Sequence, residues 1–267
     1  MISNINYVKK VMGELRAKKK FGQNFLIDEN IVDKIARNAC DSDLKTVEIG
    51  PGLGALSEQL LKYSKCVDAY EIDKDMYDLL TDNIHDDRLN VYLGDFLDVD
   101  LDKYTERVNI CANLPYYVTT PILFKIIESN LDFNKMTIMI QKEVGDRILS
   151  KVNDEDYGAL SIECQYLFEI KNEMNVSRNV FYPMPNVDSV VLSFIPIRDR
   201  DREYEKDFFD FVKNCFRFRR KTLYNNLKDL YDSNTIERLY EELDIDNNIR
   251  AQQIDLDTFI KMWEMVK

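Results

Sequence analysis

Nine residues decide the fold of this chain: Thr46-Val47-Glu48-Ile49-Gly50-Pro51-Gly52-Leu53-Gly54. The apolar start predicts a short buried strand, and the alternating glycines predict a tight turn that leads into a helix. Glycine accepts positive φ and lets a ligand approach the backbone closely. The spacing differs from G-x-G-x-x-G, and no Lys-Ser or Lys-Thr follows, as a P-loop would require. The turn therefore predicts a nucleoside-binding loop in preference to a pyrophosphate cradle.

Acidic residues follow the next two predicted strands. Glu71, with Ile72 beside it, stands where an acid accepts hydrogen bonds from ribose hydroxyls. Asp95 is predicted to accept from an adenine amino group, and Phe96 to line the ring pocket. Taken singly, each acid is more typical of a solvated loop. Their order favours a site, because ligands of open α/β sheets bind at the carboxyl ends of the strands. The whole pattern suits S-adenosylmethionine.

A polar shelf is predicted after the next apolar run, in Asn113-Leu114-Pro115-Tyr116. The Asn113 side-chain carbonyl can accept from an amine, and Pro115 biases Leu114 toward an extended backbone. Tyr116 supplies a flat aromatic face. These groups suit a planar base that carries an exocyclic NH2 group. The alternative is an ordinary proline-containing turn after a strand.

Strands and helices alternate through the first half of the chain, which predicts an α/β fold with a parallel sheet and right-handed crossovers. Two further strands, 167–174 and 187–195, are predicted to pair antiparallel at the sheet edge. Beyond a charged linker near residue 200 the β character ends and four helices are expected. We therefore predict a catalytic domain over 1–199 and a small all-α domain over 200–267. The expected α/β strands are 46–49, 66–72, 89–93, 107–112 and 135–140.

Charge is distributed unevenly along the 267 residues, whose formal net charge is −12. Residues 1–20 hold six basic side chains and one acidic side chain, a local net of +5. A second basic cluster, interleaved with Phe216 and Phe218, consists of Lys213, Arg217, Arg219, Arg220 and Lys221. Local patches of this kind contact phosphates even when the net charge is negative. The alternative for each is a solvated helix face.

The five cysteines are scattered and contain no C-x-x-C, which favours reduced thiols and a cytoplasmic location. No apolar run approaches a membrane span, so no membrane partner is expected. The single histidine, His85, lies in a polar stretch. Histidine triads and histidine-rich zinc sites therefore have little support, and no metal is expected. Phe181, in a proline-fixed loop with exposed aromatics, is a candidate platform for base stacking, or else a core residue.

These motifs together resemble the small-subunit ribosomal RNA adenine dimethyltransferase family, from about Lys18 to the carboxyl end. The resemblance rests on the full ordered set, since each motif by itself is weak. The set comprises Phe21 to Asp28, Glu48 to Gly54, Gly94-Asp95, Asn113 to Ile122, Gln141 to Val144, Tyr157 to Ser161, Phe181 to Ser189 and Phe218 to Leu223.

The resemblance implies a class I S-adenosylmethionine-dependent methyltransferase fold, Rossmann-like, with a small helical carboxyl-terminal domain. It implies N6,N6-dimethylation of two adjacent adenosines near the 3′ end of small-subunit rRNA, with a partly assembled small ribosomal subunit as partner. A monomer is expected. The residues that match the family's cofactor site are Gln23, Asn24, Leu26, Gly50, Gly52, Glu71, Ile72, Asp95, Phe96 and Asn113. Those that match its target-base site are Asn113, Leu114, Tyr116 and Phe181.

Three other functions stay open at the level of sequence. The nearest is the large-subunit rRNA adenine methyltransferase group of macrolide resistance, which shares the cofactor loop and a similar Asn-x-Pro-Tyr motif. The continuation Tyr117 to Pro121 and the Phe21 to Asp28 loop favour the small-subunit branch. A ribosome assembly factor that has lost catalysis is the second, and a small-molecule methyltransferase is the third.

Overall fold

The chain forms two compact units in a computed structural model that describes residues 4–15, 24–197 and 201–267. The first unit comprises Met1–Lys142 and Lys171–Pro196, and the second comprises Glu143–Ile170 and Ile197–Lys267. The predicted boundary near residue 200 lies close to the start of the last segment. However, residues 143–170 group with the C-terminal helices and not with the catalytic domain. The reason is packing within the second unit, where Tyr166 contacts the rings of Phe208 and Phe209.

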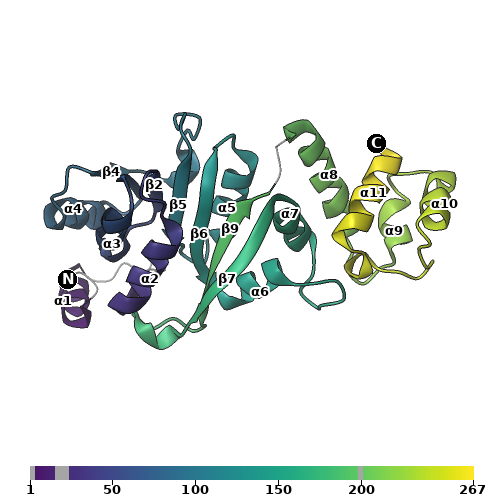
Figure 1. Cartoon of the computed structure of the whole chain (residues 1–267). Helices are drawn as coiled ribbons and strands as arrows, with labels where there is room; N and C mark the ends of the chain where they lie inside the picture. Colours follow the sequence, from purple (N-terminus) through teal and green to yellow (C-terminus); the bar gives the residue numbers. More distant parts are fainter. Residues whose placement is uncertain (1–3, 16–23, 198–200) are drawn as a thin grey trace. The chain divides into compact units, whose positions relative to one another are not determined.

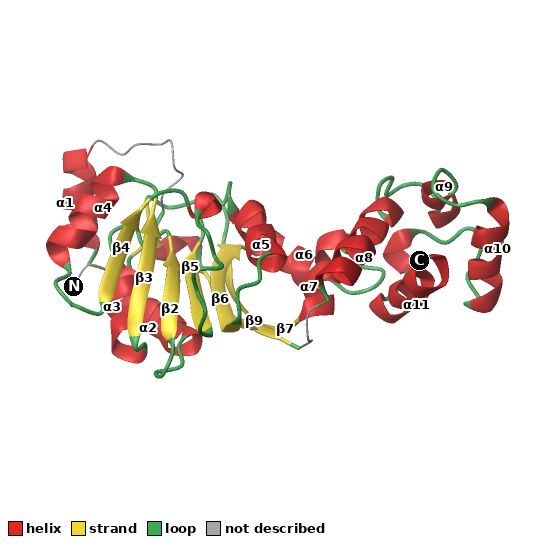
Figure 2. Cartoon of the chain, turned by 90° about the horizontal axis from the view of Figure 1, so that it is seen from above, coloured by secondary structure: helices red, strands yellow, loops and turns green. Residues whose placement is uncertain are grey.

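A seven-stranded sheet forms the centre of the fold (Figure 1), and Figure 2 shows its strands in the order β4-β3-β2-β5-β6-β9-β7. The first five strands along this order are parallel, and β9 is antiparallel to β6. The predicted parallel α/β sheet and its antiparallel edge are thus confirmed. The strands are β2 (Lys45–Ile49), β3 (Cys66–Glu71), β4 (Leu89–Leu93), β5 (Val108–Asn113), β6 (Phe133–Gln141), β7 (Phe168–Val176) and β9 (Ser189–Pro196).

Strand β2 lies at the point where the order of the strands reverses. The chain proceeds from β2 to β3 and β4 on one side, and then returns to place β5 on the other side. Residues 46–49 are all buried, as expected of a central parallel strand covered on both faces. Because the segments leaving β2 and β5 diverge at such a switch point, a crevice forms at their carboxyl ends.

Helices cover the sheet, and two of them, α2 and α3, lie along one face (Figure 2). Their apolar side chains pack against Val67, Cys111 and Met139 of the strands. Asp28 caps α2 by accepting from two backbone N–H groups. The helices of the first unit are α1 (Ile5–Leu15), α2 (Glu29–Ala39), α3 (Ala55–Tyr63), α4 (Lys74–Asn83) and α5 (Thr119–Glu128).

A second, two-stranded sheet was not predicted from the sequence. Strand β1 (Phe25–Leu26) pairs antiparallel with β8 (Phe181–Tyr182), which places Leu26 opposite Phe181. A two-residue strand is too short to show an alternating apolar pattern, and these two strands are distant along the chain. The sequence therefore predicted a loop at both positions. Their pairing joins the loop before α2 to the loop before β9.

The second unit is helical except where β7 begins. Its core is aromatic: Phe216 packs against Tyr157 and Phe259, and Phe211 packs against Trp263. Four helices follow residue 200, as predicted. The helices here are α6 (Lys142–Leu149), α7 (Ala159–Leu167), α8 (Arg202–Cys215), α9 (Leu223–Leu227), α10 (Ser233–Glu242) and α11 (Leu256–Val266).

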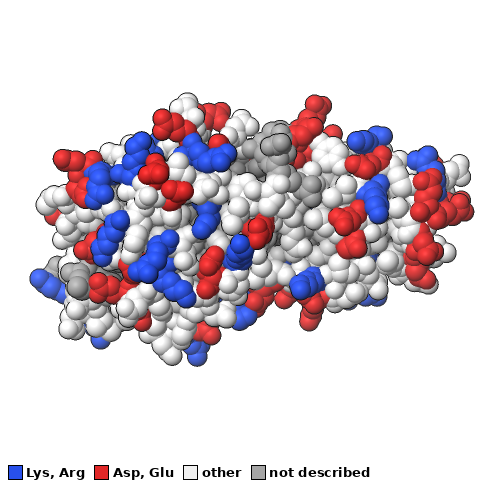
Figure 3. All heavy atoms as spheres, viewed as in Figure 1, with Lys and Arg blue, Asp and Glu red and all other residues white. Residues whose placement is uncertain are grey.

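The surface carries both signs of charge, and Figure 3 shows basic and acidic side chains interspersed on the face that it presents. None of the helices in the described ranges combines the length and apolar composition needed to cross a bilayer.

Candidate active site

A cavity lies at the carboxyl ends of β2, β3 and β5 in the first unit. Its wall brings together side chains that are far apart in the sequence, from the loop before α2 to the loop before β9. Both the predicted cofactor residues and the predicted target-base residues contribute. Those that line it are Asn24, Leu26, Gly50, Gly52, Glu71, Ile72, Asn113, Leu114, Tyr116 and Phe181.

The glycine turn has the backbone that its sequence predicts. Gly50, Gly52 and Gly54 have φ values of 68°, 57° and 89°, which residues with a Cβ rarely adopt. A Cβ on Gly52 would also lie 3.1 Å from the Phe25 ring. The amide of Gly50 donates to the Tyr70 carbonyl at 2.9 Å, which ties the turn to β3. The turn is thereby fixed at the cavity wall.

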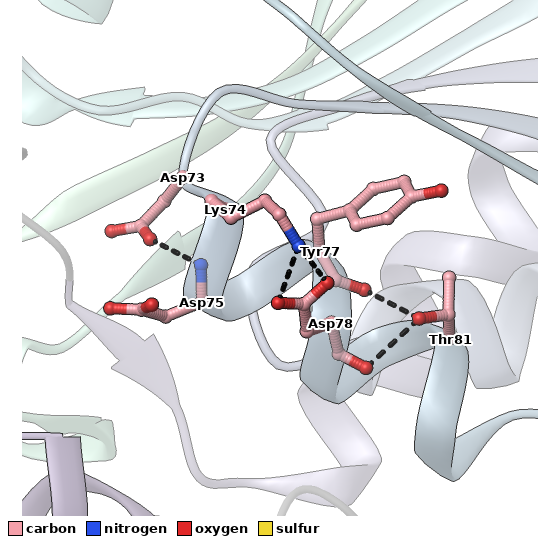
Figure 4. A network of polar contacts seen from close by, with 6 residues as sticks. All are labelled: Asp73, Lys74, Asp75, Tyr77, Asp78 and Thr81. Atoms are coloured by element: carbon pink, nitrogen blue, oxygen red, sulfur yellow. Dashed lines mark hydrogen bonds and ion pairs between the residues drawn. The ribbon is translucent and has the colours of Figure 1, made fainter.

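Glu71 ends β3 with its carboxylate held in place by backbone donors. One oxygen accepts from the Gly52 amide at 2.9 Å and the other from the Asp73 amide at 2.8 Å. Asp73 in turn caps α4 by accepting from the Asp75 amide, and Lys74 pairs with Asp78 on the first turns of that helix (Figure 4). Burial raises the pKa of Glu71, and the two N–H donors oppose that rise. The carboxylate is therefore rigid and faces the cavity.

Glu48 is a cavity residue that the sequence analysis did not assign to the site. Its side chain is buried, and one oxygen accepts from the Ser57 hydroxyl at 2.6 Å. The other oxygen, Oε1, has no hydrogen-bond partner among the residues that the structure describes. The pKa of Glu48 is raised to about 8, chiefly by burial. The Ser57 hydrogen bond lowers this pKa, whereas the nearby charge of Glu71 raises it. An acidic residue within an otherwise apolar strand is the sequence signal that could have identified it.

The Asn113–Tyr116 shelf forms where β5 ends. Asn113 lies opposite Met139 of β6, and the Leu114 amide donates to the Met139 carbonyl at 3.1 Å. The Tyr116 hydroxyl lies 3.1 Å from the Ser189 hydroxyl at the start of β9. Within the described ranges no residue hydrogen-bonds the Asn113 side-chain amide. Its carbonyl can thus accept from a ligand amine.

Two of the described cofactor candidates, Asp95 and Phe96, are not among the residues that line the cavity. Asp95 lies at the end of β4 and caps the short helix Phe96–Asp98 by accepting from the Leu97 amide. Phe96 is buried with its ring edge against Tyr70. Gln23 lies outside the described residues. Tyr117 also lines the cavity and is 59% exposed. Partial burial raises the pKa of Tyr117, and the negative charges of Asp95 and Glu71 raise it further.

Phe181 lines the cavity but is only 3% exposed, so the expectation of an exposed ring at this position is wrong. Its side chain belongs to a core cluster with Val32 and Ile35 of α2, because β8 pairs with β1 directly above that helix. The exposed large apolar side chains of the loop are those of Met184 and Val187. The role of Phe181 as a base-stacking residue stays a prediction.

All five basic side chains of the cluster in the second unit are exposed, but two of them also make polar contacts within that unit. Lys213 lies 3.8 Å from the buried Glu163 carboxylate, and the Arg219 guanidinium donates to the Glu155 and Tyr157 carbonyls. Arg217 lies over the exposed ring of Phe218. Arg220 and Lys221 are also exposed. Phe216 belongs to the core instead.

The charge of the cavity limits what it can bind. Its described wall carries two carboxylic acids, Glu48 and Glu71, and no lysine, arginine or histidine. Anionic phosphates are therefore poor ligands for its interior, whereas a ligand that bears a positive charge is favoured. With the glycine turn and the rigid carboxylate of Glu71, these features fit a cationic nucleoside such as S-adenosylmethionine.

Comparison with known proteins agrees with this geometry. The model of the family described as ribosomal RNA adenine dimethylase matches residues 14–267. A ribosomal RNA small subunit methyltransferase A of Mycoplasmopsis pulmonis is 42% identical over 93% of this chain and 98% of its own length. The crystal structure of a dimethyladenosine transferase from Plasmodium falciparum has a TM-score of 0.76 at 27% identity, over 89% of this chain and 95% of that one. The 23S rRNA methyltransferase ErmE shares the fold, with a TM-score of 0.72 at 23% identity.

The strand order and the site at the carboxyl ends of β2, β3 and β5 define an α/β methyltransferase. Within that class, the chain belongs to the ribosomal RNA adenine dimethylase family.

Proposed function

We propose that this chain dimethylates N6 of two adjacent adenosines near the 3′ end of small-subunit rRNA, with S-adenosylmethionine as the methyl donor. The observation that carries the proposal is the Asn113 amide, which lines the cavity together with Tyr116 and which no residue of the described ranges hydrogen-bonds. The similarity to relatives named ribosomal RNA small subunit methyltransferase A favours the small-subunit substrate over the large-subunit alternative.

The cofactor would be held along the glycine turn. Gly50 and Gly52 would allow its close approach, the Glu71 carboxylate would accept from the ribose hydroxyls, and Ile72 would contact the adenine ring. Asn24 and Leu26 would cover the methionine part together with Gln23, and Asp95 and Phe96 would complete the adenine pocket from the end of β4. When bound, S-adenosylmethionine supplies a methyl group that is electrophilic because it is attached to a sulfonium.

The chain's own residues then act on the target amine. The N6 lone pair of adenine is delocalised into the ring, so the amine is a poor nucleophile. Hydrogen bonds from N6 to the Asn113 side-chain oxygen and the Leu114 carbonyl favour a tetrahedral nitrogen whose lone pair points into the cavity. Tyr116 and Phe181 stack on the extruded base and offset a few kcal/mol of unstacking. The methylated nitrogen is cationic and loses its proton readily, so no side-chain base is needed.

Exposed basic residues would bind the rRNA backbone. Lys9 and Lys10 lie on the exposed face of α1, and Lys9 lies over the Tyr182 ring next to Phe181. Arg220 and Lys221, with the Arg217–Phe218 pair, are the exposed candidates in the second unit. Structured RNA is recognised largely through shape and backbone, which favours a partly assembled subunit as substrate.

The test supplies methyl-labelled S-adenosylmethionine to small subunits that lack adenine dimethylation and, in parallel, to large-subunit rRNA. Label on two adjacent small-subunit adenosines, recovered as dimethyladenosine, is the expected result. Label confined to large-subunit rRNA would transfer the protein to the resistance-type group. Tight subunit binding without label would identify an assembly factor.

A further inference from the structure

The position of the Tyr116 ring depends on a contact made by β9. The Tyr116 hydroxyl lies 3.1 Å from the Ser189 Oγ, and the Ser189 side chain is buried. Tyr116 itself is half-buried at the cavity wall. An aromatic ring attached only through its own backbone can rotate about two torsions. A hydrogen bond to the phenolic oxygen holds the far end of the ring in place and so restricts the first torsion, which sets the direction of the ring.

Ser189 is itself held firmly. It opens β9 and lies opposite Gln141 in the ladder between β6 and β9. Its neighbour Asp188 accepts from the Lys142 amide through its backbone carbonyl and from the Arg178 amide through its carboxylate, each at 2.9 Å. The hydroxyl of Ser189 is therefore presented to Tyr116 by a segment with few conformational alternatives.

The same segment ends the loop that begins at Phe181. Phe181 is fixed at one end by its pairing with Leu26, and Ser189 fixes the other end of the loop to the sheet. The two aromatic walls of the cavity, Tyr116 and Phe181, are thus positioned by a single loop between β8 and β9. Tyr116 belongs to a different part of the sequence and is coupled to this loop through Ser189.

We infer that Ser189 is a positioning residue for methyl transfer: its hydroxyl holds the far end of the Tyr116 ring, and so directs the ring toward the place where the target adenine stacks. The inference rests on the proposed function, because it assigns the Tyr116 ring to the target base. Ser189 does not contact the base or the cofactor. Loss of one neutral hydrogen bond that orients a stacking group predicts about a five- to tenfold loss of kcat.

A double-mutant cycle tests this coupling. Tyr116→Phe keeps the ring and removes its hydroxyl, Ser189→Ala removes the other hydroxyl, and the double variant removes both. If Ser189 acts only through the Tyr116 hydroxyl, all three lose kcat on small subunits to the same extent, and their affinities for S-adenosylmethionine equal that of the wild type. Losses that multiply in the double variant would overturn the inference.

The matched control is Ser193→Ala. Ser193 is another buried serine of β9, but it donates to Glu173 and not to the site. We expect Ser193→Ala to keep the wild-type kcat and Ser189→Thr, which retains the hydroxyl, to recover most of the loss. If Ser189→Ala and Ser193→Ala have the same kcat, the positioning role of Ser189 is overturned, while the proposed function still stands. A wild-type protein that methylates no small-subunit adenosine would instead overturn the proposed function.

Discussion

Replacing Glu48 by Gln tests whether the buried carboxyl keeps its proton in the folded protein. Its pKa is about 8 in the folded chain, against an ordinary value of 4.5. Between these values the folded protein keeps a proton that the unfolded chain has released, so the free energy of unfolding falls as the pH rises. At about 1.4 kcal/mol per pH unit, the full effect on the ligand-free protein is about 5 kcal/mol, reached near pH 8.

Gln is the same size as Glu and can still accept from Ser57, but it does not titrate. Any cost of its buried amide N–H groups is independent of pH. The quantity to measure is therefore the unfolding free energy of Glu48→Gln minus that of the wild type. This difference should rise by several kcal/mol between about pH 5 and about pH 8, because only the wild type loses stability over that range.

Denaturant unfolding of the ligand-free proteins at both pH values measures this difference. Glu106→Gln, at an exposed position, is the control and should show no such shift. A Glu48→Gln difference that is the same at both pH values would refute the reasoning, because the carboxyl would then be ionised in the folded protein as it is in the unfolded chain.

Further variants test the rest of the site. Asn113→Ala should lower kcat by about 100-fold with little change in S-adenosylmethionine affinity, because the lost acceptor acts on the amine during transfer; an equal loss of cofactor binding, measured by calorimetry, would contradict its assigned role. Gly52→Ala should weaken cofactor binding, since the residue has positive φ and its Cβ would lie 3.1 Å from the Phe25 ring; unchanged affinity would show that the turn is not part of the cofactor site. Phe181→Ala should lower turnover and also destabilise the fold by about 3 kcal/mol, because the ring is buried in the core; thermal unfolding separates the two effects, and wild-type turnover would remove Phe181 from the target-base site.

Much of this site was predictable because its signals are local. The glycine turn requires residues that accept positive φ, and such a requirement is visible wherever the glycines stand. Glu71 follows a strand whose apolar pattern marks its end, and parallel strands bring their carboxyl ends to one edge of the sheet. The same argument placed Asn113 beside the cavity. The sequence by itself thus determined the sheet, the turn and the edge at which the ligand site lies.

Only the tertiary structure decided which side chains meet at that edge. The hydroxyls of Tyr116 and Ser189 are 73 positions apart and come together because β9 lies antiparallel to β6. Phe181 is buried because β8 pairs with β1 over α2. Among the described residues, only one oxygen of Glu48 has a hydrogen-bond partner, the Ser57 hydroxyl. Periodicity encodes the face that a residue presents, but not the distant residue that it contacts, which depends on strand register and packing.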